Sequence, residues 1–166
     1  MVGFHKMMAT KTANGMYDYN AIVCDKTLDA WVQETHHMMS REYGWKSTPL
    51  KPGCFGYDNL VVSLAYCYER LLQSIEKTSV SLEEVSDFIH QGWILNYVYW
   101  RDHQPWVINK AYIKPAKALG DERRNMCAST AYNDLPEDEK QKDRLIAAYF
   151  LKHFQVYLCM RSKLDE

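Results

Sequence analysis

Glycine and proline, the residues that most often form tight turns, are scarce in this sequence. The chain has 166 residues and contains 7 glycines and 5 prolines. A β-sandwich or β-barrel connects many short strands through such turns. In addition, no segment alternates between apolar and polar residues over the length of a strand. The sequence therefore argues against an all-β fold.

An excess of positive charge is also lacking, since the formal net charge is -1. Nucleic-acid-binding domains usually carry a strong excess of lysine and arginine, so no nucleic-acid partner is expected. The longest apolar stretch, around residues 60–68, is far shorter than the roughly 20 residues that cross a bilayer. The N-terminus has no apolar run of the signal-peptide kind. We therefore predict a cytoplasmic protein without membrane contact.

Cysteine occurs in a pattern that supplies no obvious pairs. The five residues are Cys24, Cys54, Cys67, Cys127 and Cys159. The number is odd, and no two of them stand at the C-x-x-C spacing of zinc and redox sites. We therefore expect reduced thiols without a bound metal.

Motifs of catalysis and metal binding are missing. The sequence contains no P-loop, no G-x-G-x-x-G, no G-x-S-x-G and no H-E-x-x-H. His36 and His37 are adjacent on a predicted helix, where neighbours point in different directions, so they are poorly placed to hold one metal ion. A cysteine nucleophile paired with a distant histidine stays open. We predict a protein that is not an enzyme and needs no cofactor.

Helical periodicity is the main positive signal. Apolar residues recur at three- and four-residue spacing in several segments, and a hydrophobic content of 47% is enough for a buried core. The predicted helices run from an N-cap at Asp25 to Tyr43, from about Asp58 to Ile75, from a capping box at Ser81–Glu84 to about Trp100, in a short turn after Pro105, and from Pro136 onward. Gly44 is placed to end the first of them in a left-handed conformation.

The segments between these helices are predicted to lack regular structure. They are residues 45–57, 78–80 and 117–132, and the tail from residue 161 is expected to fray. Residues 1–22 carry no period and are predicted to form an arm. The expected fold is an all-α, compact bundle of four to five helices with long loops, in a single domain over residues 23–166.

Aromatic residues are concentrated in one part of the chain. Residues 93–112 contain Trp93, Tyr97, Tyr99, Trp100, Trp106 and Tyr112, interleaved with Asn96, Arg101, Asp102, His103 and Asn109. Most aromatic residues serve packing, so a core-facing stripe is the first interpretation. An aromatic-walled cleft for a flat ligand such as a nucleobase is the second. Residue types alone favour the first and leave the second open.

Two segments, DFIHQGWILNYVYW at 87–100 and ERRNMCASTAYNDLPEDEKQKDRLIAAYFLK at 122–152, resemble the ryanodine-receptor repeat. The positions that match the family's second motif are Tyr132, Leu135, Pro136, Glu137, Glu139, Lys140, Asp143 and Arg144. The chain departs from the pattern at Ala131, where the family usually has proline, and after Trp100, where it carries an insertion. Residues 78–160 would form one such repeat, and the N-terminal half, with Tyr57 and Asp58 before a second helix, resembles a degenerate second copy.

The resemblance implies a binding module of the stand-alone viral, phage or bacterial type, some members of which have been proposed to bind nucleotide-like ligands. In the family, the helix with the histidine packs against the loop with the tyrosine, which implies a cleft for an anionic planar ligand. Its predicted residues are His90, Trp93, Trp100, Arg101, Arg123, Arg124 and Tyr132. The alternative is a structural interaction protein, for example a virion or assembly component, that uses its aromatic surface to bind another chain. Homo-oligomerisation stays open, and a viral protein would reside in the host cytoplasm or virion.

Overall fold

The computed structural model describes residue 12 and residues 15–74, 80–103 and 118–164. The described residues contain five α-helices and one two-stranded hairpin, which confirms the predicted all-α bundle. The helices are α2 (Leu28–Tyr43), α3 (Phe55–Gln73), α4 (Leu82–His103), α6 (Ala118–Ala128) and α7 (Glu137–Leu164), with a short 3-10 helix, η3 (Tyr132–Asp134), before α7. The short helix predicted after Pro105 lies outside the described residues, as does most of the predicted arm.

The N-cap of the first helix lies two residues after the predicted one. Asp25 lies in the turn of a hairpin formed by β1 (Ile22–Val23) and β2 (Lys26–Thr27). The N-cap is Thr27, whose hydroxyl accepts a hydrogen bond from the Ala30 backbone N–H at 3.1 Å. The prediction that Asp25 is the N-cap was wrong. Asp25 lies within the hairpin, and Thr27, a residue type that often caps helices, is the last residue before the helix. The predicted C-terminal end of this helix is confirmed, since α2 ends at Tyr43 and Gly44 caps it with a left-handed φ of 69°.

The two candidate caps of α2 can be separated by mutation. Thr27→Ala is expected to lower the free energy of unfolding by about 1 kcal/mol, because it leaves a backbone N–H of the first turn without its partner. Asp25→Ala is the matched control and should change stability by less than about 0.5 kcal/mol. Urea unfolding of both variants measures the difference. An equal loss in the two would contradict the assignment of the cap to Thr27.

The starts of α4 and α7 agree with the sequence. The Glu84 backbone N–H donates to the Ser81 hydroxyl at 3.1 Å, as the capping-box motif predicts. Helix α7 begins directly after Pro136, whose carbonyl accepts from the Lys140 N–H at 3.0 Å. Helix α3 begins at Phe55, three residues before the predicted start, so the preceding loop is shorter than expected.

Two segments predicted to be irregular are helical. Residues 118–128 form α6, although residues 117–132 were expected to be a loop, and α7 continues to Leu164 although the tail was expected to fray from residue 161. Among the residues of α6 with described side chains, only Cys127 is buried. A helix that buries so little has no strong apolar period, which is why the pattern missed it.

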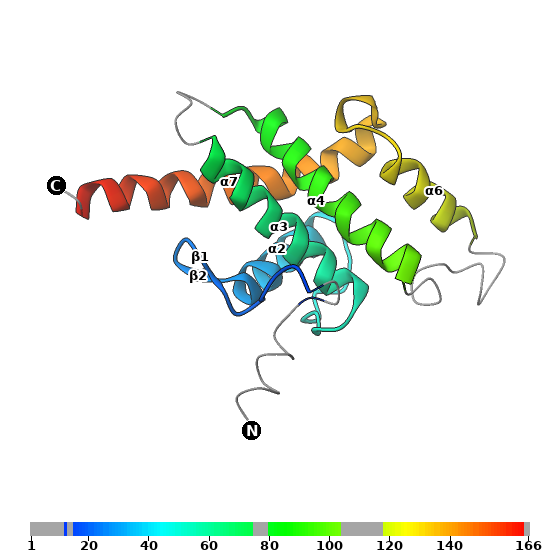
Figure 1. Cartoon of the computed structure of the whole chain (residues 1–166), viewed down its shortest axis with the longest axis horizontal. Coiled ribbons are helices and arrows are strands. Elements are labelled where there is room, and N and C mark those ends of the chain that lie inside the picture. The colour runs from blue at the N-terminus through cyan, green and yellow to red at the C-terminus, as the bar shows by residue number, and fades with distance from the viewer. Residues whose placement is uncertain (1–11, 13–14, 75–79, 104–117, 165–166) are drawn as a thin grey trace, which may run out of the picture.

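The core gathers around α4, which packs against α3, α6, α7 and η3. One apolar cluster includes side chains from α2, α3, α4 and α7, among them the fully buried Trp31 and Phe150. Figure 1 shows the C-terminal turns of α7 extending beyond the other described helices. All five cysteines lie in the described part of the chain and are unpaired thiols. No described helix has the length and apolar character needed to span a membrane.

Candidate functional site

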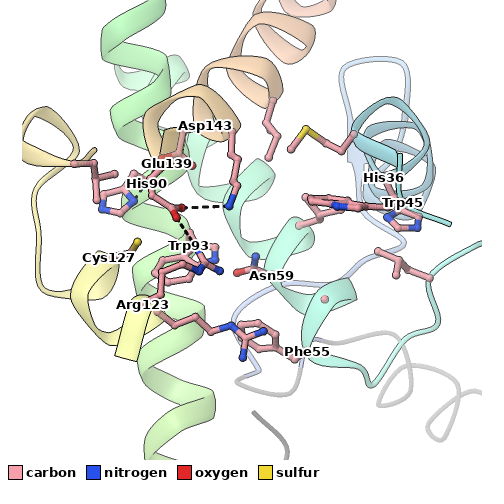
Figure 2. Close-up of a pocket in the computed structure, with 18 residues that line it drawn as sticks. His36, Trp45, Phe55, Asn59, His90, Trp93, Arg123, Cys127, Glu139 and Asp143 are labelled. Carbon is pink, nitrogen blue, oxygen red and sulfur yellow. Dashed lines mark hydrogen bonds and ion pairs between the residues drawn. The ribbon is translucent and has the colours of Figure 1, made fainter. Parts of the chain in front are cut away.

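A cavity of about 380 Å³ opens where α2, α3, α4, α6 and α7 approach one another. This volume lies in the range of pockets that hold small ligands, about 300–1,000 Å³. Its lining combines apolar, aromatic and charged side chains (Figure 2). The residues are His36, Met39, Trp45, Leu50, Phe55, Gly56, Asn59, Leu60, His90, Trp93, Arg123, Arg124, Cys127, Leu135, Glu139, Lys142, Asp143 and Ile146.

One wall of the cavity is a loop that α2 holds in place. The Gln33 side chain makes two hydrogen bonds with the Leu50 backbone: its amide donates to the carbonyl at 2.9 Å and accepts from the N–H at 3.0 Å. The His36 Nε2–H donates to the Thr48 carbonyl at 3.0 Å. These bonds fix the Leu50 end of the segment that presents Trp45 and Leu50 to the cavity.

Aromatic rings form a second part of the lining. The half-buried Trp93 stacks on Tyr97 with the ring planes 4° apart and the centroids separated by 5.1 Å. Its other neighbour is the His90 ring, at 6.1 Å. The Arg124 guanidinium lies 5.7 Å from the centroid of the Phe55 ring, which is within the range of a cation–π contact. The rings give the cavity flat apolar surfaces beside a cation.

The charged part of the cavity is centred on Glu139. Its carboxylate accepts from Arg123 Nη1 at 2.7 Å and lies 3.5 Å from Lys142 Nζ. Burial raises the pKa of Glu139, but the hydrogen bond from Arg123 and the charge of Lys142 outweigh this effect and hold the pKa below its usual value. Glu139 is therefore ionised at neutral pH and orients two of the three cations that line the cavity.

The pKa of Asp143 is shifted in the opposite direction from that of Glu139, although Asp143 lies only one helical turn further along α7. Burial is the largest cause that raises its pKa to about 8, and the charge of Glu139 adds to it. At neutral pH this carboxyl is therefore mostly protonated. His90 faces it, with Nδ1 at 3.6 Å from Asp143 Oδ2, and donates through Nε2 to the Thr130 carbonyl at 2.8 Å. The pair places a largely neutral acid in the cavity wall, so the cations exceed the ionised carboxylates.

The structure brings together four of the seven predicted site residues. His90, Trp93, Arg123 and Arg124 line the cavity. The other three do not, and each is held elsewhere by its own contacts. Trp100 is 1% exposed and its indole N–H donates to Asp58 at 3.3 Å, while Tyr132 is also 1% exposed and its hydroxyl donates to Glu83 at 2.6 Å. Arg101 donates to Asp102 and Asn125.

Several lining residues were not predicted as site residues. In the sequence, Glu139 and Asp143 stand out only as part of the motif that resembles the family's helix start, and Lys142 lies in the same stretch. Their i, i+3 and i+4 spacing puts them near one face of α7, which was the available signal. Trp45 and Asn59 come from the N-terminal half, and no local pattern connects them to α4 or α7.

The described residues contain no group of three or more His, Cys, Asp or Glu side chains that could hold a metal ion. Compared with protein-family models, curated proteins and solved structures, the chain matches none. The resemblance of residues 78–160 to the ryanodine-receptor repeat therefore stays a hypothesis that rests on the sequence motifs.

Proposed function

We propose that the chain is a non-enzymatic binding module for a small, planar, anionic ligand of the nucleotide type, held in the cavity between α2, α4 and α7. The observation that carries the proposal is the pairing of cations with aromatic surfaces in one cavity of ligand size. Arg124 lies over Phe55, while Arg123 and Lys142 converge on the nearby Glu139. A guanidinium group can donate two parallel hydrogen bonds to the oxygens of one phosphate or carboxylate. It can also stack on a flat ring.

The charge balance favours an anion over a cation. Glu139 is shared between two cations and Asp143 is mostly protonated at neutral pH, because its pKa is about 8. The remaining positive charge sits beside low-dielectric apolar walls, where an electrostatic attraction is stronger than in water. The family resemblance supports the same class of ligand, since small members of that family have been proposed to bind nucleotide-like molecules.

The alternative function, a structural interaction protein, has weaker support from the aromatic residues. Trp100 and Tyr132, two of the aromatic residues predicted for the ligand site, are each only 1% exposed and belong to the interior, so they add nothing to an aromatic contact surface. The strongest observation in favour of the alternative lies elsewhere, at Val156 and Met160, which are 54% and 61% exposed and stand one turn apart near the end of α7. An apolar pair of this size is common on protein surfaces, so the cavity is the better basis for a function.

Binding of AMP tests the proposal, with adenosine and inorganic phosphate as the two halves of the ligand. AMP is expected to bind more tightly than either half in isothermal titration calorimetry. Arg123→Ala should weaken AMP binding by about 1–3 kcal/mol, the range for charge-assisted hydrogen bonds. The Arg123 side chain is 45% exposed, so its loss should leave the melting temperature nearly unchanged.

Arg101→Ala is the matched control, because Arg101 was predicted in the same site but does not line the cavity. It should bind AMP as the wild type does. Equal losses in the two variants would point to a nonspecific charge effect, and absence of AMP binding by the wild type would reject the proposed function.

A further inference from the structure

The Glu139 carboxylate lies between two of the cations that line the cavity. Its Oε1 accepts a hydrogen bond from Arg123 Nη1 at 2.7 Å, and its Oε2 lies 3.5 Å from Lys142 Nζ. Figure 2 shows the contact between Glu139 and Arg123. The Glu139 side chain is 11% exposed, whereas those of Arg123 and Lys142 are 45% and 35% exposed. The carboxylate is therefore largely covered, while a molecule in the cavity can reach both cations.

The two cations are arranged as they would be around a bound acid. Each contacts a different oxygen of the same carboxylate, and all three residues line the cavity of ligand size. Cations that converge on two oxygens of a carboxylate can also converge on two oxygens of a phosphate. Glu139 thus takes the place that the acid group of a ligand would need.

We propose that Glu139 is an internal substitute for the acid group of the ligand, and that a phosphate monoester displaces its carboxylate from Arg123 and Lys142. This proposal rests on the proposed function and names the acid that the site takes. The two cations carry two positive charges, of which Glu139 balances one. A phosphate monoester carries about -1.5 to -2 charges at neutral pH, so it is attracted more strongly than the carboxylate it replaces. A carboxylate ligand would only repeat the contacts that Glu139 already makes.

Removing the charge of Glu139 should strengthen the binding of AMP, because a neutral amide competes less well for the cations. Glu139→Gln keeps the shape of the side chain and an acceptor oxygen for Arg123. Isothermal titration calorimetry is expected to show about 10-fold tighter binding of AMP, the ratio between a charge-assisted and a neutral hydrogen bond. Adenosine, which has no acid group, should bind the wild type and the variant equally. Adenosine-5′-carboxylic acid should bind the wild type no more tightly than adenosine.

Two controls separate displacement from a general effect of negative charge. Glu137→Gln removes an acid from the same turn of α7, where Glu137 pairs with Arg144 at 2.8 Å and does not line the cavity. Its affinity for AMP should stay within about 2-fold of the wild type, because solvent screens a charge outside the cavity. In an Arg123→Ala background Glu139 has lost its hydrogen-bond donor, so Glu139→Gln should improve AMP binding by less than about 3-fold.

The outcomes distinguish this proposal from the proposed function. A Glu139→Gln variant that binds AMP as the wild type does, or more weakly, would overturn the displacement, because Glu139 would then position the cations for the ligand. An equal gain in Glu137→Gln or in the Arg123→Ala background would also overturn it, as a general charge effect. Wild-type binding of adenosine-5′-carboxylic acid as tight as that of AMP would overturn the choice of a phosphate. These results leave the proposed function standing, whereas failure of the wild type to bind AMP would overturn both.

Discussion

Replacing Gly92 with alanine is expected to destabilise the protein by about 1–3 kcal/mol, the range for inserting extra carbon atoms into a packed core. A Cβ at this position would lie 2.8 Å from the Ser63 Cα and 3.1 Å from the Val62 carbonyl oxygen. Both atoms belong to the backbone of α3, so the collision cannot be relieved by turning a side chain. The two helices would have to separate at the centre of the bundle.

Gly56→Ala is the matched control for this prediction. Gly56 also lies in a helix, but the nearest atom to an added Cβ is a Leu50 methyl carbon at 4.0 Å. Alanine is the better helix former by up to about 1 kcal/mol, so this variant should be as stable as the wild type or more so. Urea unfolding gives both values. A Gly92→Ala variant as stable as Gly56→Ala would contradict the close crossing of α3 and α4.

Asp143→Asn is expected to make the protein more stable at alkaline pH. The pKa of Asp143 is about 8 in the folded protein and 3.8 when unperturbed. Between these values the folded protein holds a proton that the unfolded chain has lost, so stability declines as pH rises from about 4 to about 8 and then levels off. Asparagine is neutral at every pH and avoids this loss, which amounts to about 5–6 kcal/mol for a shift of this size.

Urea unfolding of wild type and variant between about pH 4 and pH 9 measures this difference. The two proteins should have similar free energies of unfolding near pH 4, and the variant should become increasingly more stable than the wild type as the pH rises. The groups that face Asp143 are His90, Glu139, Lys142 and Asp87, and they remain in both proteins, so the difference between the two curves reports on Asp143. Two parallel curves, or a variant less stable at pH 8, would show that Asp143 is already ionised in the folded protein at neutral pH.

The same change should alter ligand binding. Ionisation of Asp143 above its pKa adds a negative charge to the wall of a cavity proposed to hold an anion. AMP binding by the wild type is therefore expected to weaken above about pH 8, whereas binding by Asp143→Asn should not.

Local signals in the sequence predicted the helix boundaries best where a single residue determines them. Gly44, Ser81 and Pro136 each mark a boundary by their own backbone or side-chain chemistry, and the structure agrees at all three. Asp25 is not the cap because the residues before Thr27 form a hairpin. The Trp31 indole N–H, which donates to the Val23 carbonyl, helps to hold this hairpin in place. That contact is not visible in the local sequence.

The sequence predicted only part of the candidate site. Aromatic and arginine residues near α4 and α6 were identified by type, but type does not say which of them is buried: Trp93 lines the cavity, whereas Trp100 is part of the interior. Trp45 and Asn59 reach the cavity through the packing of α2 and α3 on α4. Such convergence depends on tertiary structure and has no periodic signal.

The indole N–H signals of the tryptophans, followed by NMR during titration with AMP, test most directly whether the cavity is the binding site. Trp45 and Trp93 line the cavity, whereas Trp31 and Trp100 are buried outside it and serve as internal controls. The Trp45 and Trp93 signals should shift and saturate with one common dissociation constant, while those of Trp31 and Trp100 stay in place. Unchanged Trp45 and Trp93 signals at millimolar AMP, or shifts confined to the controls, would contradict binding in the cavity.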